Sequence, residues 1–513
     1  MPVLQKVLLA VLVGTAPLLA ADFRLAAPVS DHMVLQRDKP VAVWGFGDPE
    51  EEIDVAFGGQ NKQAVADAEG RWSVRLDAMP ASTEPRTLVA VGKGGRTVEA
   101  RDVLVGEVWL GSGQSNMAMT VQRCLDFDRE KAAANLPLIR HYKESSAPAE
   151  APRLEGTGVW SVCSPDTVGG FSATLYFFGR EVRRELGVPV GLINTSVGGT
   201  PIESWLSAET QRSDPATKAV YESRLQEYLS FDVAAAPDLH RKQMDLWRAA
   251  VAKARAEGKT FVTPPPKNPL AMRKLKGGPA FLFNGKVANL VPYTLRGMLW
   301  YQGEGNANSP ELYETQLAQL VTSWRALWAD ELPFAWVQLP NYRDSKSENW
   351  PRMRESMMRV LALPKTGMAI TLDVGDPKDI HPKNKQEVGR RLALWALGTV
   401  YDRTVPAISG PLPAGHTVDG SSITIDFRHA AGLKTRDGGP LRGFVMAGAD
   451  RVWKTAAACI TDISGETVVV SSAEVPAPVA VRYAWAENPD GNLINGAGLP
   501  ATTFRTDDWP AAK

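Results

Sequence analysis

Ser115 is the residue whose type and setting most directly offer a nucleophile. It stands in the segment 113–117 (Gly-Gln-Ser-Asn-Met), just after the strand-like run 103–110 and a glycine-rich turn. A serine between a strand and a helix exposes its hydroxyl at the carboxyl edge of a sheet, beside free N–H groups that can stabilise an oxyanion. The pattern lacks the final glycine of the α/β-hydrolase motif G-x-S-x-G. A helix-capping serine is the alternative, and Ser112 and Ser196 are competing nucleophiles.

A serine nucleophile needs a base, and His381 is the best placed of the six histidines. It follows a predicted strand (368–374) and precedes a predicted helix marked by apolar residues at helical spacing. The carboxylates of Asp373, Asp376 and Asp379 lie upstream, and one of them could orient the imidazole and stabilise its protonated form. An ordinary loop before a helix is the alternative. The pattern therefore favours a serine–histidine–carboxylate group.

Two more loops follow predicted strands and carry groups of the right kind. Gly199, in the segment 197–200 (Val-Gly-Gly-Thr), can bring its N–H close to a reacting carbonyl. In the segment 300–306 (Trp-Tyr-Gln-Gly-Glu-Gly-Asn), the Gln302 and Asn306 amides could donate to an oxyanion. Glu304 is a candidate for substrate binding, and so are Gln114 and Asn116, which flank Ser115. Ligands of parallel sheets bind at the carboxyl ends of the strands, so these loops are expected to meet.

Composition excludes several other classes of function. The chain has 513 residues, 57 basic and 57 acidic, so its formal net charge is zero. That balance argues against nucleic acid or an anionic membrane as the main partner. No C-x-x-C or H-E-x-x-H motif is present, and we expect no cofactor. Three cysteines allow at most one disulfide, for which Cys124 and Cys163 are candidates.

The pattern of apolar residues divides the chain into four parts. Residues 1–21 read as a signal peptide, with Lys6 before an apolar run and small residues at 20–21, so the protein is expected to be secreted or periplasmic, with no membrane anchor. Residues 22–101 alternate like short strands between turns, which predicts an N-terminal β-sandwich-like domain. In residues 102–402 apolar strands alternate with amphipathic helices, which predicts an α/β domain with a parallel sheet covered on both faces. Residues 403–513 return to the strand pattern and predict a C-terminal β-domain.

A polar, Ala-rich and Lys/Arg-rich segment, about 206–278, interrupts the predicted α/β domain. Its pattern is helical over 221–228 and 241–256, and it ends near three consecutive prolines at 264–266. We interpret it as a helical insertion. A lid over the site and a solvated excursion without a role are equally consistent with this composition.

Taken together, these segments resemble the sialate O-acetylesterase family of SGNH-type (GDSL-like) carbohydrate esterases. The resemblance is carried by 108–117, 171–173, 198–205, 283–285, 300–304 and 379–382, and it spans nearly the whole chain after residue 21. It implies an SGNH-type hydrolase core that needs no metal, with Ser115 as nucleophile and His381 as base. The general pattern puts the acid three residues before the histidine, where this chain has Lys378. Asp379 is therefore preferred, with Asp376 in reserve.

The resemblance also sets expectations for the oxyanion hole and the substrate. The N–H groups of Ser115 and Gly199 are the expected donors. The family-wide G-x-N-D pattern is absent, so either Gln302 or Asn306 could complete the hole. The expected reaction is hydrolysis of sugar acetyl esters, on an acetylated sialic acid or on a plant polysaccharide such as xylan or xyloglucan. A sialate carboxylate would need a cation, for which Arg123 and Arg343 are candidates. A lipase, a thioesterase and a non-catalytic carbohydrate-binding protein are the rival functions, and the oligomeric state stays open.

Overall fold

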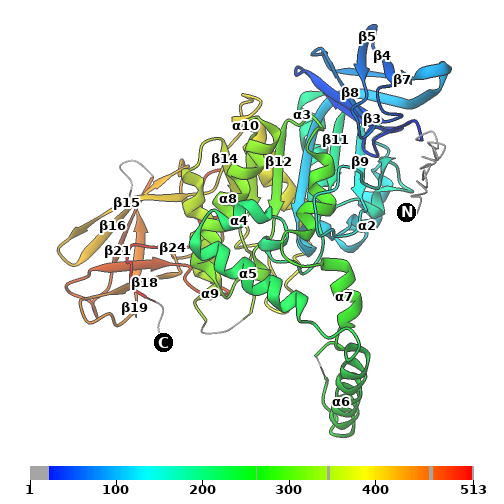
Figure 1. Ribbon diagram of the computed structural model, residues 1–513. Coiled ribbons are helices and arrows are strands. Elements are labelled where there is room, and N and C mark those ends of the chain that lie inside the picture. The colour runs from blue at the N-terminus through cyan, green and yellow to red at the C-terminus, as the bar shows by residue number, and fades with distance from the viewer. Residues whose placement is uncertain (1–21, 262, 344–346, 462–465, 511–513) are drawn as a thin grey trace, which may run out of the picture.

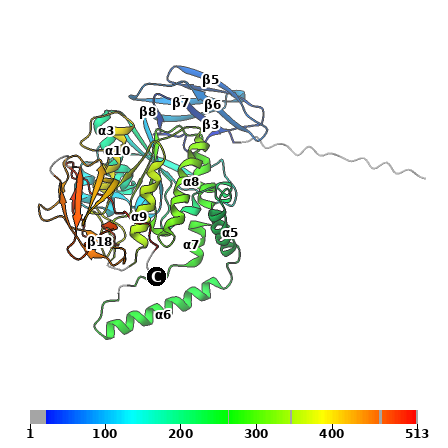
Figure 2. The same ribbon diagram turned by 90° about the vertical axis from the view of Figure 1, so that its left-hand side faces the viewer.

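The computed structural model describes residues 22–261, 263–343, 347–461 and 466–510, so the predicted signal peptide lies outside the described residues. A central α/β body carries a β-rich region at each end (Figure 1). The first lies at the blue end of the chain and the second at the orange and red end. A long helix projects from the body on a third side, as the rotated view also shows (Figure 2).

The central body is built on a sheet of six parallel strands with one antiparallel edge strand. Its spatial order is β10-β9-β11-β8-β12-β13-β14, and only β10 runs against its neighbour. From the central strand β8 the chain first builds the β9 and β11 side and then crosses to β12, so the carboxyl end of β8 is a topological switch point, where α/β sheets bind ligands. The strands are β8 (Thr97–Gly113), β9 (Ile139–Glu144), β10 (Gly158–Val162), β11 (Val190–Asn194), β12 (Gly297–Tyr301), β13 (Phe334–Val337) and β14 (Thr366–Ala369).

Helices cover both faces of this sheet, as the alternation of strands and helices predicts. Successive strand residues point to opposite faces. Thus Leu299 of β12 packs in one core cluster, together with Leu192, Leu175 and Leu392, while Trp300 packs in the other with Leu320 and Met353. The first face carries α3 (Ala173–Leu186) and α10 (Lys385–Thr399), and the second carries α8 (Pro310–Trp328) and α9 (Asn349–Arg359). Strands β9 and β10 and helix α9 were not predicted from the sequence.

The N-terminal β-region is joined to the central sheet through a shared strand. Strand β8 runs without a break across the expected boundary between residues 101 and 102. Its first half pairs with β7 and β2, and its second half lies between β11 and β12. The other strands of this region are β1 (Arg24–Leu25), β2 (Val34–Gln36), β3 (Val41–Phe46), β4 (Glu52–Phe57), β5 (Gln60–Val65), β6 (Arg71–Leu76) and β7 (Ser82–Val91).

The C-terminal β-region docks against the end of the body that carries α9. Arg354 of α9 is completely buried and donates hydrogen bonds to the carbonyls of Pro340 and Glu487, at 2.7 and 2.8 Å, which link the two parts. The region comprises two four-stranded sheets and a two-stranded sheet. Its strands are β15 (Leu412–Asp419), β16 (Ser422–Arg428), β17 (Lys434–Thr435), β18 (Phe444–Ala447), β19 (Lys454–Thr455), β20 (Ala457–Ile460), β21 (Thr467–Ser471), β22 (Ala480–Tyr483), β23 (Leu493–Ile494) and β24 (Phe504–Arg505).

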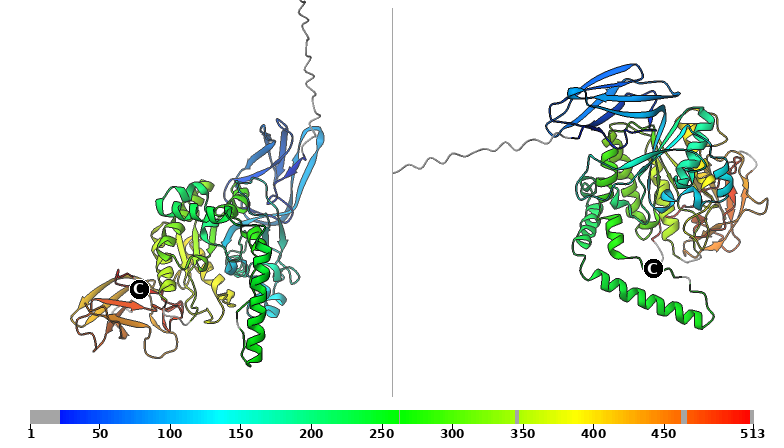
Figure 3. Two further views of the ribbon diagram at one scale, coloured as in Figure 1. Left: turned by 60° about the horizontal axis from the view of Figure 1, so that its bottom comes forward. Right: turned by 90° about the vertical axis from the view of Figure 1, so that its right-hand side faces the viewer.

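The helical insertion leaves the body after β11. Helix α6 extends away from the rest of the molecule in every view (Figure 3), and among its described residues only Ala236 is buried. Helix α7 returns to the body, where it borders the carboxyl end of the sheet. The helices are α4 (Ala208–Arg212), α5 (Pro215–Leu229), α6 (Ala236–Ala256) and α7 (Pro269–Lys276). No helix among the described residues combines the length and apolar composition needed to span a bilayer.

Candidate active site

Ser115 lies at the switch point of the sheet. Strand β8 ends at Gly113, and Ser115 is the first residue of the short helix α1 (Ser115–Ala118). The sharp turn between them needs a glycine, because Gly113 has a φ of 131° and a Cβ there would lie 2.2 Å from the carbonyl oxygen of Tyr301. The chain therefore turns against β12, and the serine is held at the carboxyl edge of the sheet.

His381 comes from the loop between β14 and α10 and meets the serine there. Its Nε2 atom lies 2.8 Å from Oγ of Ser115. Its Nδ1 atom lies 3.3 Å from Oδ1 of Asp379, and the same oxygen accepts the backbone N–H of His381 at 2.9 Å. Asp376 instead accepts the backbone N–H of Lys378 at 2.8 Å. The structure thus brings Ser115, His381 and Asp379 into one hydrogen-bonded line, with Asp376 beside it.

The surroundings of His381 keep its imidazole neutral. Burial lowers the pKa of His381 below its usual value, and the neighbouring Asp379 carboxylate only partly opposes this effect. The charges of Lys385 and Arg123 act in the same direction as burial. A neutral imidazole has a free lone pair on one ring nitrogen, so His381 can accept the Ser115 proton at neutral pH.

The loop that contains Gly199 lies against Ser115. A Cβ on Gly198 would lie 3.4 Å from Cβ of Ser115, so no side chain separates this loop from the serine. Gly199 has a φ of 68°, and its carbonyl accepts a hydrogen bond from the Lys276 ammonium of α7. Within the described part of the chain, neither the N–H of Gly199 nor that of Ser115 donates a hydrogen bond to another residue.

Gln302 and Asn306 lie in the same region, but their amides are engaged with protein groups. The Asn306 amide accepts from the N–H of Ile202 at 2.9 Å and donates to Glu203 at 2.9 Å. The Gln302 amide donates to Asn306 at 2.8 Å and to the carbonyl of Thr200 at 3.3 Å. Both residues are buried. Their amide nitrogens thus clamp the loop after β12 to the loop that contains Gly199.

The three residues expected to bind substrate connect the turn of Ser115 with the surrounding loops. Gln114 is buried, and its side-chain oxygen accepts the N–H of Gly305 at 3.1 Å. Asn116 is completely buried and donates to Glu304 and, at 3.1 Å, to the carbonyl of Ile380. Burial raises the pKa of Glu304, whose Oε2 atom is buried without a hydrogen-bond partner among the described residues.

Lys385, which belongs to no predicted motif, lies in the same group of side chains. It is completely buried, and its Nζ atom donates to the Asn116 oxygen at 2.6 Å. Burial lowers the pKa of Lys385 to about 7. It also lies 4.8 Å from the centre of the Tyr301 ring. A lysine at the first position of a helix, where cations are unfavourable, was the available signal in the sequence.

The competing nucleophiles have no base beside them. Ser112 is completely buried and its hydroxyl has no partner among the described residues, while the Ser196 hydroxyl donates to Asn194 at 2.6 Å.

Cys124 and Cys163, the candidates for a disulfide, are buried free thiols. No group of three or more His, Cys, Asp or Glu side chains in the described part of the chain could hold a metal ion.

Two cavities reach the loop beside Ser115, and α7 contributes to the walls of both. One, of about 380 Å³, is lined by Gly199, Tyr228 and Lys276 among others. The second, of about 600 Å³, is lined by Gly198, Ser196 and Lys274 among others. Helix α7 of the insertion therefore borders the loop beside Ser115, while the exposed helix α6 lies farther out.

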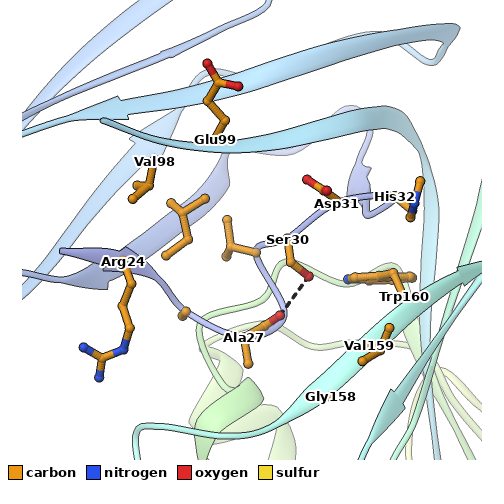
Figure 4. A pocket seen from close by; sticks show the side chains of 13 residues that line it. Arg24, Ala27, Ser30, Asp31, His32, Val98, Glu99, Gly158, Val159 and Trp160 are labelled. Atoms are coloured by element: carbon orange, nitrogen blue, oxygen red, sulfur yellow. Dashed lines mark hydrogen bonds between the residues drawn. The ribbon is translucent and has the colours of Figure 1, made fainter. Parts of the chain in front are cut away.

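Another cavity, of about 450 Å³, lies where the N-terminal β-region meets β10 (Figure 4). Ser30 and His32 both line it, but they do not form a pair. The Ser30 hydroxyl donates to the carbonyl of Ala27 at 3.0 Å, and His32 contacts Asp102 at 2.6 Å. This cavity therefore lacks the arrangement found at Ser115.

Comparison with known proteins agrees with this geometry. A family model described as "Carbohydrate esterase, sialic acid-specific acetylesterase" matches residues 105–231 and 282–397. Sialate O-acetylesterase of Mus musculus is 28% identical over 91% of this chain and 90% of its own length, and that of Homo sapiens is 29% identical over 76% and 73%. The crystal structure of a carbohydrate acetylesterase from Xanthomonas citri is 36% identical, covers 95% of this chain and 100% of its own, and superposes with a TM-score of 0.79. The match includes the strands and loops that carry Ser115 and His381, and the chain belongs to the sialate O-acetylesterase family of carbohydrate esterases.

Proposed function

We propose that this carbohydrate O-acetylesterase works by a serine mechanism in which Ser115 is the nucleophile, His381 the base and Asp379 the acid. The observation that carries the proposal is the 2.8 Å separation between Nε2 of His381 and Oγ of Ser115. A nucleophile and a base within hydrogen-bond reach, with a third group beside the base, are what covalent acyl transfer requires.

The reaction proceeds in two steps. His381 takes the proton of Ser115 as Oγ attacks the acetyl carbonyl, and the resulting oxyanion is stabilised by the N–H groups of Ser115 and Gly199. The tetrahedral intermediate collapses, the sugar oxygen leaves with the proton from His381, and acetyl-serine remains. Water, activated by His381, then attacks this ester and releases acetate, and Ser115 regains its proton. Asp379 orients the imidazole and stabilises its protonated form.

In this proposal Gln302 and Asn306 act indirectly, by holding the Gly199 loop in place. Each oxyanion-hole donor contributes roughly 3 to 4 kcal/mol in serine hydrolases, so a small displacement of the loop would be costly. The clamp between Asn306 and residues Ile202 and Glu203 supports this role. Gln114, Asn116 and Glu304 likewise link the loops of the site, and the sugar contacts expected of them stay a prediction.

For the substrate we propose an acetylated sugar within an oligosaccharide or polysaccharide. The two cavities that reach Gly198 and Gly199 provide space for sugar units beside the acetylated one. A terminal acetylated sialic acid, the substrate that the names of the mammalian relatives suggest, is the second candidate. Arg123 and Arg343, the candidate partners of a sialate carboxylate, both lie near the histidine loop. The charge of Arg123 lowers the pKa of His381, and the backbone N–H of Arg343 donates to the carbonyl of Pro377 at 3.1 Å.

Acetate release from acetylated xylan or xyloglucan and from O-acetylated sialic acid, measured side by side, distinguishes these substrates. A kcat/KM at least tenfold higher on the polysaccharide is the expected result. A tenfold preference for the sialic acid would overturn this substrate assignment but would not affect the proposed catalytic residues.

We further propose that the central body is an SGNH-type core with flanking β-domains. We also propose that the protein is exported to the periplasm or outside the cell.

A further inference from the structure

We propose that Lys385 is a positioning residue of the esterase, which acts through Asn116 to hold the loop of His381 against Ser115. This inference rests on the proposed roles of Ser115 and His381. It begins with the hydrogen bonds of one side chain, because Asn116 contacts three separate elements: α10 through Lys385, the histidine loop through Ile380, and the loop after β12 through Glu304.

Lys385 determines which way the Asn116 amide faces. The ammonium head group of lysine donates hydrogen bonds and cannot accept them, so in this form the 2.6 Å contact places the amide oxygen toward Nζ. The amide nitrogen then faces the opposite side, where the carbonyl of Ile380 and the carboxyl of Glu304 both accept. Without Lys385 the amide could rotate and place its oxygen against these acceptors. The contact with Ile380, next to His381 in the chain, would then be lost.

The setting of Lys385 is costly for stability, which argues against a purely structural role. Its side chain is completely buried, and no carboxylate of the described residues lies within ion-pair distance of Nζ. It is also the first residue of α10, at the positive end of the helix dipole. An apolar residue in its place would avoid the cost of taking the charged head group out of water. Residues that conflict with the usual preferences for burial and for position in a helix occur mostly at functional sites.

The test compares Lys385→Met with Lys383→Met, which removes an exposed lysine two positions earlier. We expect Lys385→Met to lower kcat at least tenfold with KM changed less than twofold. Its melting temperature should change little, because removal of the buried charge offsets the hydrogen bond that the Asn116 oxygen loses. Lys385→Gln, which keeps an N–H donor, should recover part of kcat. Lys383→Met should leave kcat, KM and the melting temperature unchanged.

A double-mutant cycle with Asn116→Ala shows whether Lys385 acts through Asn116. In the Asn116→Ala background, Lys385→Met should lower kcat less than twofold further. A full additional tenfold loss there, or a wild-type kcat for Lys385→Met alone, overturns the proposal. Lys385→Leu replaces Lys385→Met in the same cycle if that variant does not fold. Ser115→Ala is assayed in parallel: if it stays active, the proposed catalytic serine is wrong, whereas an inactive Ser115→Ala beside a fully active Lys385→Met refutes only the role of Lys385.

Discussion

The Nε2 atom of His381 lies 2.8 Å from Oγ of Ser115, although 266 positions separate the two residues in the chain. The serine follows the central strand β8 and the histidine follows the edge strand β14, two strands beyond the neighbouring β12. The histidine loop therefore has to extend back across the carboxyl edge of the sheet. The contact consequently depends on the groups that hold this loop as well as on the pair itself.

Replacement of Ser115 by alanine should reduce acetate release by at least about 10⁴-fold, because the acyl-enzyme cannot form. The melting temperature should stay close to that of the wild type, since only one hydroxyl is lost. Ser112→Ala is the matched control at the end of β8, as its buried hydroxyl has no partner among the described residues. If Ser112→Ala lost activity while Ser115→Ala stayed active, Ser112 would be the nucleophile.

The pH profile of kcat/KM should rise along an acid limb whose midpoint lies below about 6.5, the ordinary histidine pKa. The sign follows from burial, which disfavours the protonated imidazole and lowers the pKa of His381. The neutral base is then present at lower pH than for an exposed histidine. Initial rates with an acetylated substrate from pH 4 to 8 provide the measurement, and a midpoint above 7 would contradict this account.

Asp379→Asn should lower kcat about 10²-fold or more, since the carboxylate no longer stabilises the imidazolium. It should also shift the acid limb to still lower pH, because the Asp379 carboxylate raises the pKa of His381 and its removal leaves burial unopposed. Asp376→Asn is the matched control and should change neither quantity. Equal losses in both variants would make Asp376 a second partner of the histidine.

Gly199→Ala should lower kcat at least tenfold. Its φ of 68° is strained for alanine, and the new Cβ would meet the Lys276 head group at 3.2 Å, so the loop with its N–H donor would shift. Gly187→Ala has the same conformation, with a φ of 70°, in open space at the end of α3, away from the site. It should cost roughly 1 kcal/mol of stability and leave kcat unchanged. Similar kcat values in the two variants would exclude a role for the Gly199 loop.

Asn306→Leu should lower kcat and also destabilise the protein by about 1 to 3 kcal/mol, because Ile202 and Glu203 lose their buried partners. Thermal unfolding and steady-state kinetics measure the two effects. Asn308→Leu is the control, since Asn308 is exposed and contacts only Asn349 through its side chain among the described residues. A stable Asn306→Leu variant with normal kcat would show that the clamp is not needed.

Much of the fold could be predicted from local patterns alone. The predicted alternation of apolar strands and amphipathic helices within 102–402 is present as β8, β11, β12, β13 and β14 with α3, α8 and α10. Strands buried on both faces are continuous apolar runs, so they stand out from their surroundings. Strand β9 (Ile139–Glu144) carries Arg140, His141 and Lys143 and lacks such a run, which is why it was missed. The expected domain boundary at residue 101 fell inside β8, because a strand shared by two regions shows no break in its pattern.

At the site, the sequence by itself determined which residues could be nucleophile and base, since residue type and position after a strand are local properties. Ser115 was recognisable from its turn, and His381 from its carboxylates and its place before α10. Only the tertiary structure decided the contacts: Asp379 rather than Asp376 beside the histidine, the amides of Gln302 and Asn306 engaged in a loop clamp, and Lys385 against Asn116. Hydrogen-bond partners depend on which distant loops pack together and on which groups are buried. Local periodicity carries no information about either.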